Sequence, residues 1–113
     1  MKIFKLFSIA LAALLFSMNV NAQKADSKVS SFKVSGNCDM CKERIEGAVK
    51  IDGVTKANWD DKTQKLTVTY NPAKVKMDDL QKKVAAVGHD TEKYKADNKV
   101  YAKLPGCCQY ERK

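Results

Sequence analysis

The sequence contains no apolar run long enough to cross a membrane comfortably, no internal repeat and no low-complexity tract. Its longest apolar stretch covers residues 6–16 and is interrupted by Ser8, whereas a transmembrane helix needs about 20 consecutive apolar residues. An uncleaved N-terminal anchor is therefore disfavoured, and we expect no stable membrane insertion of the mature chain.

The first 22 residues have instead the pattern of a secretory signal peptide. Lys2 and Lys5 precede or border the apolar stretch, and Val20 and Ala22 stand where a cleavage site requires small residues. No cysteine lies near this point, which disfavours a lipid-anchored lipoprotein. The sequence therefore predicts an exported protein, periplasmic or secreted, whose mature part is residues 23–113.

A mature chain of that length allows one small domain with a modest core. The full sequence has 21 Lys and Arg against 13 Asp and Glu, which gives a formal net charge of +8. A basic surface suits nucleic acid, an anionic membrane or an acidic protein. Export argues against a genomic role, and acidic residues lie between the scattered lysines. We therefore interpret the lysines as a solvated surface and expect no nucleic-acid partner.

Four cysteines are present as two tight pairs, Cys38 with Cys41 and Cys107 with Cys108. An even number in an exported chain first suggests disulfides, but small disulfide scaffolds usually spread their bridges along the chain. Two local pairs are more typical of a metal or redox site. A disulfide between Cys38 and Cys41 stays compatible with this interpretation, because oxidation would switch metal binding off.

Hydrophobic periodicity predicts the element order β-α-β-β-α-β. The expected elements are a strand at 30–35, a helix from about 42, a hairpin of strands at 54–60 and 66–70, a helix at 77–87, a short strand within 89–95 and a short helix at 98–104. This order is the ferredoxin-like arrangement, an α+β fold in which both helices cover one face of an antiparallel sheet. We expect a flexible segment at 23–28, the domain at 29–95 and a C-terminal extension at 96–113.

Cys38 and Cys41 fall where the first strand gives way to the first helix. Gly36 and Asn37 break the strand, and Asp39 is expected to cap the helix. The dipole and the free N–H groups of a helix start favour thiolate over thiol, and adjacent thiolates bind soft metal ions. This spacing predicts that Cys38 and Cys41 hold such an ion.

Beyond the cysteine pair, four segments resemble the heavy-metal-associated domain family. They are the first helix, the turn after it, the third strand with its exit turn, and the end of the second helix, at 44–49, 53–54, 68–72 and 87–89. The resemblance covers about residues 29–94. The family includes copper chaperones, the metal-binding modules of copper-exporting ATPases and the periplasmic mercury-binding protein. The resemblance therefore implies a ferredoxin-like metal carrier rather than an enzyme.

Cu(I) is the ion that this resemblance favours, with Hg(II) or Zn(II) as alternatives, and a metal-transporting ATPase or another metal-binding protein would be the partner. Two thiolates suit Cu(I) or Hg(II), whereas Zn(II) prefers four ligands. A thiol–disulfide oxidoreductase is the rival function, since Cys-x-x-Cys at a helix start is also the thioredoxin arrangement. The chain has no tryptophan before Cys38 and no βαβ order, which disfavours that rival.

The chain departs from the family pattern in two ways. Gly36-Asn37-Cys38 stands where the family has Gly-Met-x-Cys, so the loop is one residue shorter and lacks a methionine. The chain also continues past the usual end of the domain to Cys107 and Cys108. We expect this pair to fold back and supply further thiolates. The alternatives are a cross-bridge to the first pair, a second metal site or pairing between chains.

His89 matches a family position on a loop beside the metal site. It is a candidate for a third ligand or for a group that tunes a ligand, and equally for a histidine that interacts with the dipole at a helix C-terminus. For Met40 we expect a contact with a partner or a filled gap rather than a thioether ligand. Lys42 is expected to face solvent, with charge compensation of bound thiolates as the alternative.

Overall fold

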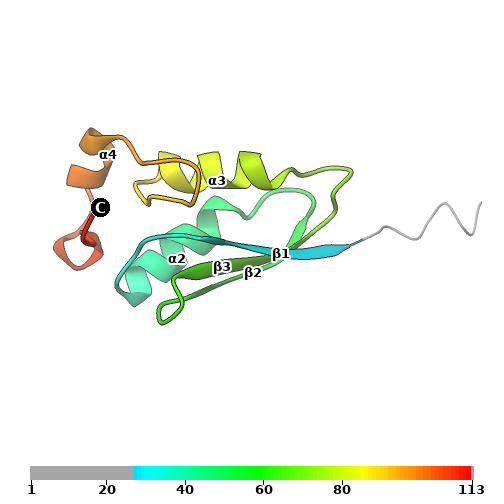
Figure 1. Ribbon diagram of the computed structural model, residues 1–113, viewed down its shortest axis with the longest axis horizontal. Helices are drawn as coiled ribbons and strands as arrows, with labels where there is room; N and C mark the ends of the chain where they lie inside the picture. Colours follow the sequence, from blue (N-terminus) through cyan, green and yellow to red (C-terminus); the bar gives the residue numbers. More distant parts are fainter. Residues whose placement is uncertain (1–26, 113) are drawn as a thin grey trace, which may run out of the picture.

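The computed structural model describes residues 27–112 as a three-stranded antiparallel sheet with helices packed on one face (Figure 1). The elements in chain order are β1 (Lys28–Lys33), α2 (Asp39–Ala48), β2 (Val54–Asp60), β3 (Lys65–Tyr70), α3 (Met77–Ala86), α4 (Asn98–Ala102) and a 3-10 turn, η1 (Gly106–Cys108). The predicted ferredoxin-like class is confirmed. The predicted signal peptide lies outside the described residues, and no helix within them is both long and apolar enough to cross a bilayer.

Strand β3 lies at the centre of the sheet, between β1 and β2. Its Leu66 is opposite Phe32 of β1 on one side and Trp59 of β2 on the other, so three large apolar side chains share one row. All three are buried. The period-two pattern of the sequence therefore places this row on the face that the helices cover.

Two details of the strands concern where β1 begins and how β2 pairs with β3. β1 begins at Lys28, which pairs with Tyr70, so this lysine belongs to the sheet although we expected it in the flexible N-terminal segment. In β2 a register shift between Val54 and Lys56 forms a β-bulge.

Helices α2 and α3 bury their predicted apolar stripes against the sheet. Ile45 and Val49 in and after α2, and Leu80 and Val84 in α3, have no exposed surface. Each such side chain stabilises the fold by about 1.5–3 kcal/mol when it leaves water. Gly88 follows α3 with φ +107°, the left-handed conformation that glycine adopts most easily at a helix end.

The last predicted strand, after α3, is not formed. Only one isolated antiparallel bridge remains, between Val34 and Thr91. The chain then reverses, because the Thr91 N–H donates to the Tyr94 carbonyl at 2.7 Å and the Asp90 carboxylate accepts the Ala96 N–H at 2.7 Å. The early end of this strand returns the chain toward the cysteine loop.

The extension that follows lies against the end of the domain at which α2 begins (Figure 1). Asp97 caps α4, with its side chain accepting the Lys99 N–H at 2.7 Å. Leu104 packs closely against Gly88, and Tyr110 is 2% exposed. The extension is therefore part of the folded domain, with its own buried anchor residues.

Candidate metal centre

The first cysteine pair lies at the start of α2. The helix begins at Asp39 rather than at Lys42, and Cys38, not Asp39, is the N-cap, with φ −131° and ψ 175°. The Cys38 carbonyl accepts the Lys42 N–H at 3.1 Å. Cys41 is therefore in the first helical turn, where it is fully buried, while Cys38 is half-buried at the helix N-terminus.

The second cysteine pair lies beside the first. The Sγ atom of Cys38 is 3.1 Å from that of Cys107 and 3.3 Å from that of Cys108. It is also 3.4 Å from the Sγ atom of Cys41. The extension thus folds back onto the first cysteine pair, as expected. Cys38 is the centre of a cluster of four sulfur atoms.

Three of these sulfurs form a compact group. The Sγ atoms of Cys38, Cys41 and Cys108 all lie within 4.8 Å of one another. Three thiolates around one ion, each at about 2.3 Å, would be about 4 Å apart, so small side-chain adjustments suffice to enclose a metal. Cys107 lies on the exposed side of this group, with its Sγ atom 3.1 Å from that of Cys38 and 3.9 Å from that of Cys108.

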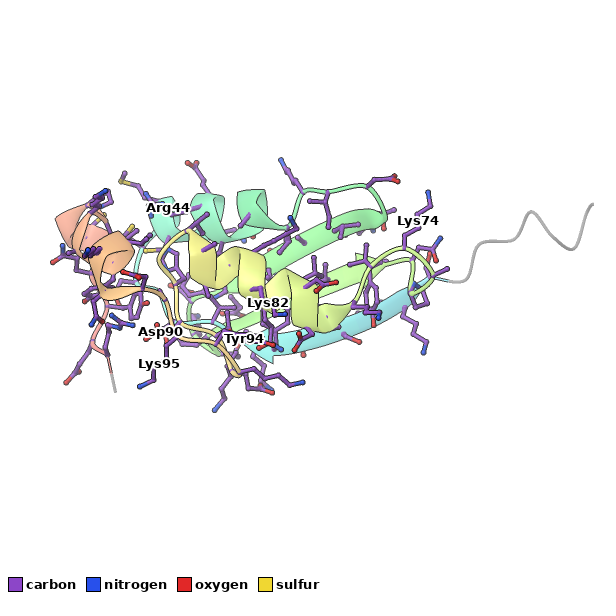
Figure 2. All side chains as sticks on the ribbon, turned by 90° about the horizontal axis from the view of Figure 1, so that it is seen from above. Arg44, Lys74, Lys82, Asp90, Tyr94 and Lys95 are labelled. Carbon is purple, nitrogen blue, oxygen red and sulfur yellow. The ribbon has the colours of Figure 1, made fainter. Side chains whose placement is uncertain are left out.

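Two hydrogen-bond donors that lie close to Cys38 and Cys41 in the sequence contact the sulfurs of the group. The Asn37 N–H points at the Sγ atom of Cys41 at 3.4 Å, and the Arg44 guanidinium donates to the Sγ atom of Cys108 at 3.2 Å. Arg44 follows Cys41 by three residues, which places both on one face of α2. Figure 2 shows Arg44 at the end of the domain that carries the extension. Donors of this kind stabilise sulfur that carries negative charge.

The four thiols do not ionise alike. Burial opposes ionisation of Cys38, but its hydrogen bonds with Cys107, Cys41 and Cys108 prevail and lower its pKa to about 6. Burial raises the pKa of Cys41 to about 12, and burial also raises the pKa of Cys108. The hydrogen bond with Cys38 raises the pKa of Cys107. The metal-free cluster therefore shares one negative charge, centred on Cys38, and a metal ion would displace the remaining protons.

His89 is fully buried behind the cysteine loop. Its Nδ1 atom donates to the Ser35 carbonyl at 2.8 Å, and its ring stacks on Tyr110 with centroids 5.5 Å apart. Its Nε2 atom has no hydrogen-bond partner among the described residues. Burial lowers the pKa of this imidazole, which favours the neutral ring. His89 does not belong to the compact group of metal-ligand atoms, and its contacts hold Ser35, just before the loop, in place.

The tail of the extension is fastened to the segment after α3. The Tyr110 hydroxyl donates to the Gly88 carbonyl and accepts the Asp90 N–H, both at 2.8 Å. The Arg112 guanidinium bonds the Asp90 carboxylate at 2.9 Å and the Ala96 carbonyl at 2.7 Å. These bonds fix the chain after η1, and the contact of Leu104 with Gly88 fixes the chain before it, so both ends of the turn that carries the two cysteines are held.

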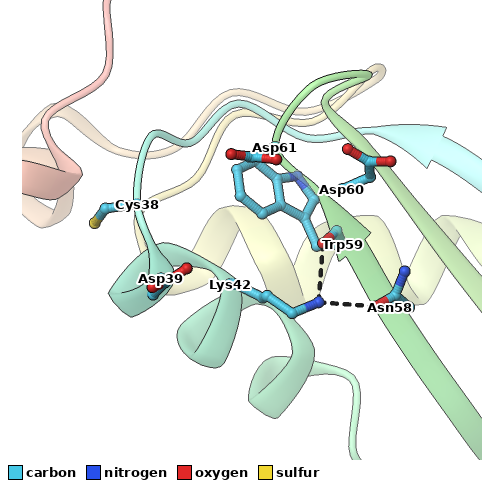
Figure 3. Close-up of a pocket in the computed structure, with 7 residues that line it drawn as sticks. All are labelled: Cys38, Asp39, Lys42, Asn58, Trp59, Asp60 and Asp61. Carbon is cyan, nitrogen blue, oxygen red and sulfur yellow. Dashed lines mark hydrogen bonds between the residues drawn. The ribbon is translucent and has the colours of Figure 1, made fainter.

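A cavity of about 260 Å³ opens beside Cys38 (Figure 3). The Lys42 ammonium lies at its wall, where it donates to the Asn58 side chain at 2.8 Å and to the Trp59 carbonyl at 3.0 Å. Lys42 also pairs with Glu46 at 2.6 Å. This partly exposed lysine is therefore bonded to strand β2 and to Glu46 rather than to the thiolates, and among the described residues Arg44 is a cation that contacts a cysteine.

Sequence reasoning missed three contributors to the site, namely Arg44, Tyr110 and the contact of Met40 with Cys107. The spacing of Arg44 from Cys41 carried a usable signal, because residues three apart on a helix are neighbours. Tyr110 and the Met40 contact depend on where the extension folds, and no local pattern announces that.

Fold and site together define a small metal-binding domain with a cysteine cluster at one end. The family model of the heavy-metal-associated domain matches residues 31–90, more than half of the chain, and the chain belongs to that family. The family likeness expected from the sequence is thereby confirmed. The match ends before the extension, so Cys107 and Cys108 lie outside the matched part.

Similar proteins handle different metals. The chain is 36% identical over 69 residues to a zinc-transporting ATPase of Synechocystis, covering 59% of this chain but only 10% of the ATPase. A solved CopZ metallochaperone is 29% identical, with a TM-score of 0.55, and 57% of this chain covers 98% of it. The N-terminal domain of a potential copper-translocating ATPase from Bacillus subtilis, solved in its Cu(I)-loaded state, is 31% identical with a TM-score of 0.55, over 58% of this chain and 85% of that one. The chain is thus related to copper- and zinc-handling domains.

Proposed function

We propose that the protein is an exported carrier or scavenger of Cu(I) that holds the ion through Cys38, Cys41 and Cys108. The observation that carries this proposal is the compact group of three sulfurs, with 3.3 and 3.4 Å between Cys38 and its two neighbours. Soft thiolates select soft ions, and three of them complete a trigonal shell around Cu(I). The Arg44 guanidinium offsets part of the negative charge that three thiolates and one Cu(I) leave.

Delivery would proceed by ligand exchange. Cys38 is half-buried at the rim of an open cavity, so a thiolate of a partner can reach an ion bound there. That partner would be a metal-transporting ATPase or another metal-binding protein. The likeness to CopZ and to the domain of a copper-translocating ATPase supports this role, and the signal-peptide pattern of residues 1–22 supports a periplasmic or secreted location.

Zn(II) is the second candidate ion, with Hg(II) as a further soft ion for the same thiolates. Zn(II) prefers four ligands in a tetrahedron, and Cys107 lies 3.1 Å from Cys38 as a fourth thiolate. The 36% identity to a zinc-transporting ATPase points in the same direction. A thiol–disulfide oxidoreductase would use the same dithiol without metal.

The test is an anaerobic competition of Cu(I), Zn(II) and Hg(II) for the reduced mature protein, residues 23–113, against chelators of known affinity. We expect the protein to compete most effectively with the chelator for Cu(I). Cys38→Ser and Cys41→Ser should each lose Cu(I) binding, while circular dichroism shows that both variants are folded. Disulfide-reductase turnover without retention of any metal would overturn the proposal. A preference for Zn(II) would move it to the second candidate.

A further inference from the structure

A second group of sulfur atoms lies on the exposed side of the cysteine cluster. The Sγ atom of Cys107 is 3.1 Å from that of Cys38 and 3.7 Å from the Sδ atom of Met40. Cys107 is exposed, and Met40 is 48% exposed. None of the described acidic residues or His89 joins these sulfurs in a compact group of ligand atoms. This outer face is therefore built from sulfur only.

The two faces arise from neighbouring residues that point in opposite directions. In η1, Cys108 is buried toward α2, whereas Cys107 is exposed. In the first turn of α2, Cys41 is buried, whereas Met40 is exposed. Two adjacent pairs thus each send one sulfur inward and one outward. The inner sulfurs join the compact group described above, and the outer sulfurs face one another across 3.7 Å.

Cys38 belongs to both faces. Its Sγ atom lies 3.1 Å from Cys107 on the outer side, and 3.3 and 3.4 Å from Cys108 and Cys41 on the inner side. A thiolate sulfur has more than one lone pair, so it is able to bridge two soft ions. With Cys38 shared, each face offers three sulfurs, and neither needs a ligand from elsewhere.

The geometry points to a second soft-metal position on the outer face, in which Cys38 bridges two Cu(I) ions and Cys107 and Met40 complete the outer one. This inference rests on the proposed function, because the inner ion shares Cys38. Soft thiolate and thioether ligands select Cu(I). The net charge does not oppose the second ion, since this Cu(I) replaces the Cys107 proton and the cluster keeps two negative charges. The Met40 thioether adds a ligand without adding charge.

The number of Cu(I) ions bound per chain tests the second position directly. Reduced mature protein is titrated anaerobically with Cu(I) in the presence of a competing Cu(I) chelator, and native mass spectrometry counts the ions bound to the monomer. We expect two ions on the wild-type monomer and one on Cys107→Ser. On Met40→Leu, the second ion should be removed at a lower chelator concentration than on wild type.

A matched control is Met77→Leu, the same substitution at the start of α3, far from η1 (Figure 1). This variant should keep both ions at the wild-type chelator concentration. Four results would each overturn the outer position. They are one ion on the wild-type monomer, two ions on Cys107→Ser, loss of the second ion from Met40→Leu and wild type at the same chelator concentration, and a second ion seen only in dimers. The proposed function would instead be contradicted if the wild-type protein bound no copper, or if Cys41→Ser bound copper as tightly as wild type.

Discussion

The two cysteine pairs arrive at one site by different means. Cys38 and Cys41 are placed by local sequence, a strand end followed at once by a helix start. Cys107 lies 69 residues after Cys38 and is placed by the packing of the extension against the segment after α3. The first pair therefore lies within the part of the chain that the family model matches, and local sequence places it. The contribution of the second pair depends on contacts that a single substitution can loosen.

The largest effect should come from Cys38, because it is the sulfur that all the others contact. We expect Cys38→Ser to lower Cu(I) affinity by more than about 100-fold. Loss of a group that only orients a metal ligand costs up to about 100-fold, and loss of the ligand itself should cost more. Cys107→Ser should cost far less, because Cys107 is exposed whereas Cys41 and Cys108 are buried. Chelator competition on both variants measures the contrast, and equal losses would show that the two pairs contribute alike.

The second prediction separates the two pairs through the anchor of the extension. Tyr110→Phe removes a buried hydroxyl that bonds Gly88 and Asp90, which should lower the free energy of unfolding by about 1–3 kcal/mol. Cu(I) affinity should fall with it, since Cys107 and Cys108 are then less well held. Tyr94→Phe is the control, because its hydroxyl bonds the partly exposed Asp78 elsewhere. Urea unfolding and chelator competition give both quantities. Unchanged affinity in Tyr110→Phe would mean that the extension does not serve the metal.

A third change tests the contact that joins the two pairs across α2. Arg44→Gln removes the guanidinium that donates to Cys108, and we expect Cu(I) affinity to fall by about tenfold, as for loss of a partner that orients a ligand. Lys50→Gln removes a positive charge from an exposed position after the same helix and should change nothing. Arg44→Lys should recover part of the loss if charge matters. Equal affinities of Arg44→Gln and Lys50→Gln would exclude a role for Arg44 at the site.

The smallest effect concerns pH. Burial lowers the pKa of His89 from its ordinary value near 6.5, so the unfolded state binds its proton more readily than the folded state. The contribution to stability is full above about pH 6.5 and declines as pH falls below that value. His89 is the only histidine in the sequence, so its imidazole signals in an NMR titration are unambiguous. A titration midpoint at or above the ordinary value would contradict its burial behind the loop.

The sequence was sufficient for the domain and insufficient for the extension, for a physical reason. Alternating and helical apolar patterns act locally, so Leu66, Ile45 and Leu80 could be assigned to the core in advance. The helix start at Asp39 was missed by a few residues because its N-cap is a cysteine, which is not a typical capping residue. Such an error moves a boundary but leaves the dithiol at the helix start.

The missing fourth strand had no such local signature. Tyr94 and its neighbours suggested a strand, but the bonds of Asp90 to Ala96 and Arg112 close a loop after one bridge. Arg112 lies 22 residues after Asp90, so this outcome depends on long-range pairing. The position of Cys107 and Cys108 follows from it. The fold-back was foreseen as one of several possibilities, because nothing near those residues specifies where they go.

X-ray absorption spectroscopy of the mature protein loaded with one equivalent of Cu(I) tests most directly whether the extension completes the metal site. We expect three sulfur ligands at about 2.3 Å in wild type. The double variant Cys107→Ser and Cys108→Ser should show two, the number that the family loop alone supplies. Two sulfur ligands in both proteins would contradict the account and leave the extension without a part in metal binding.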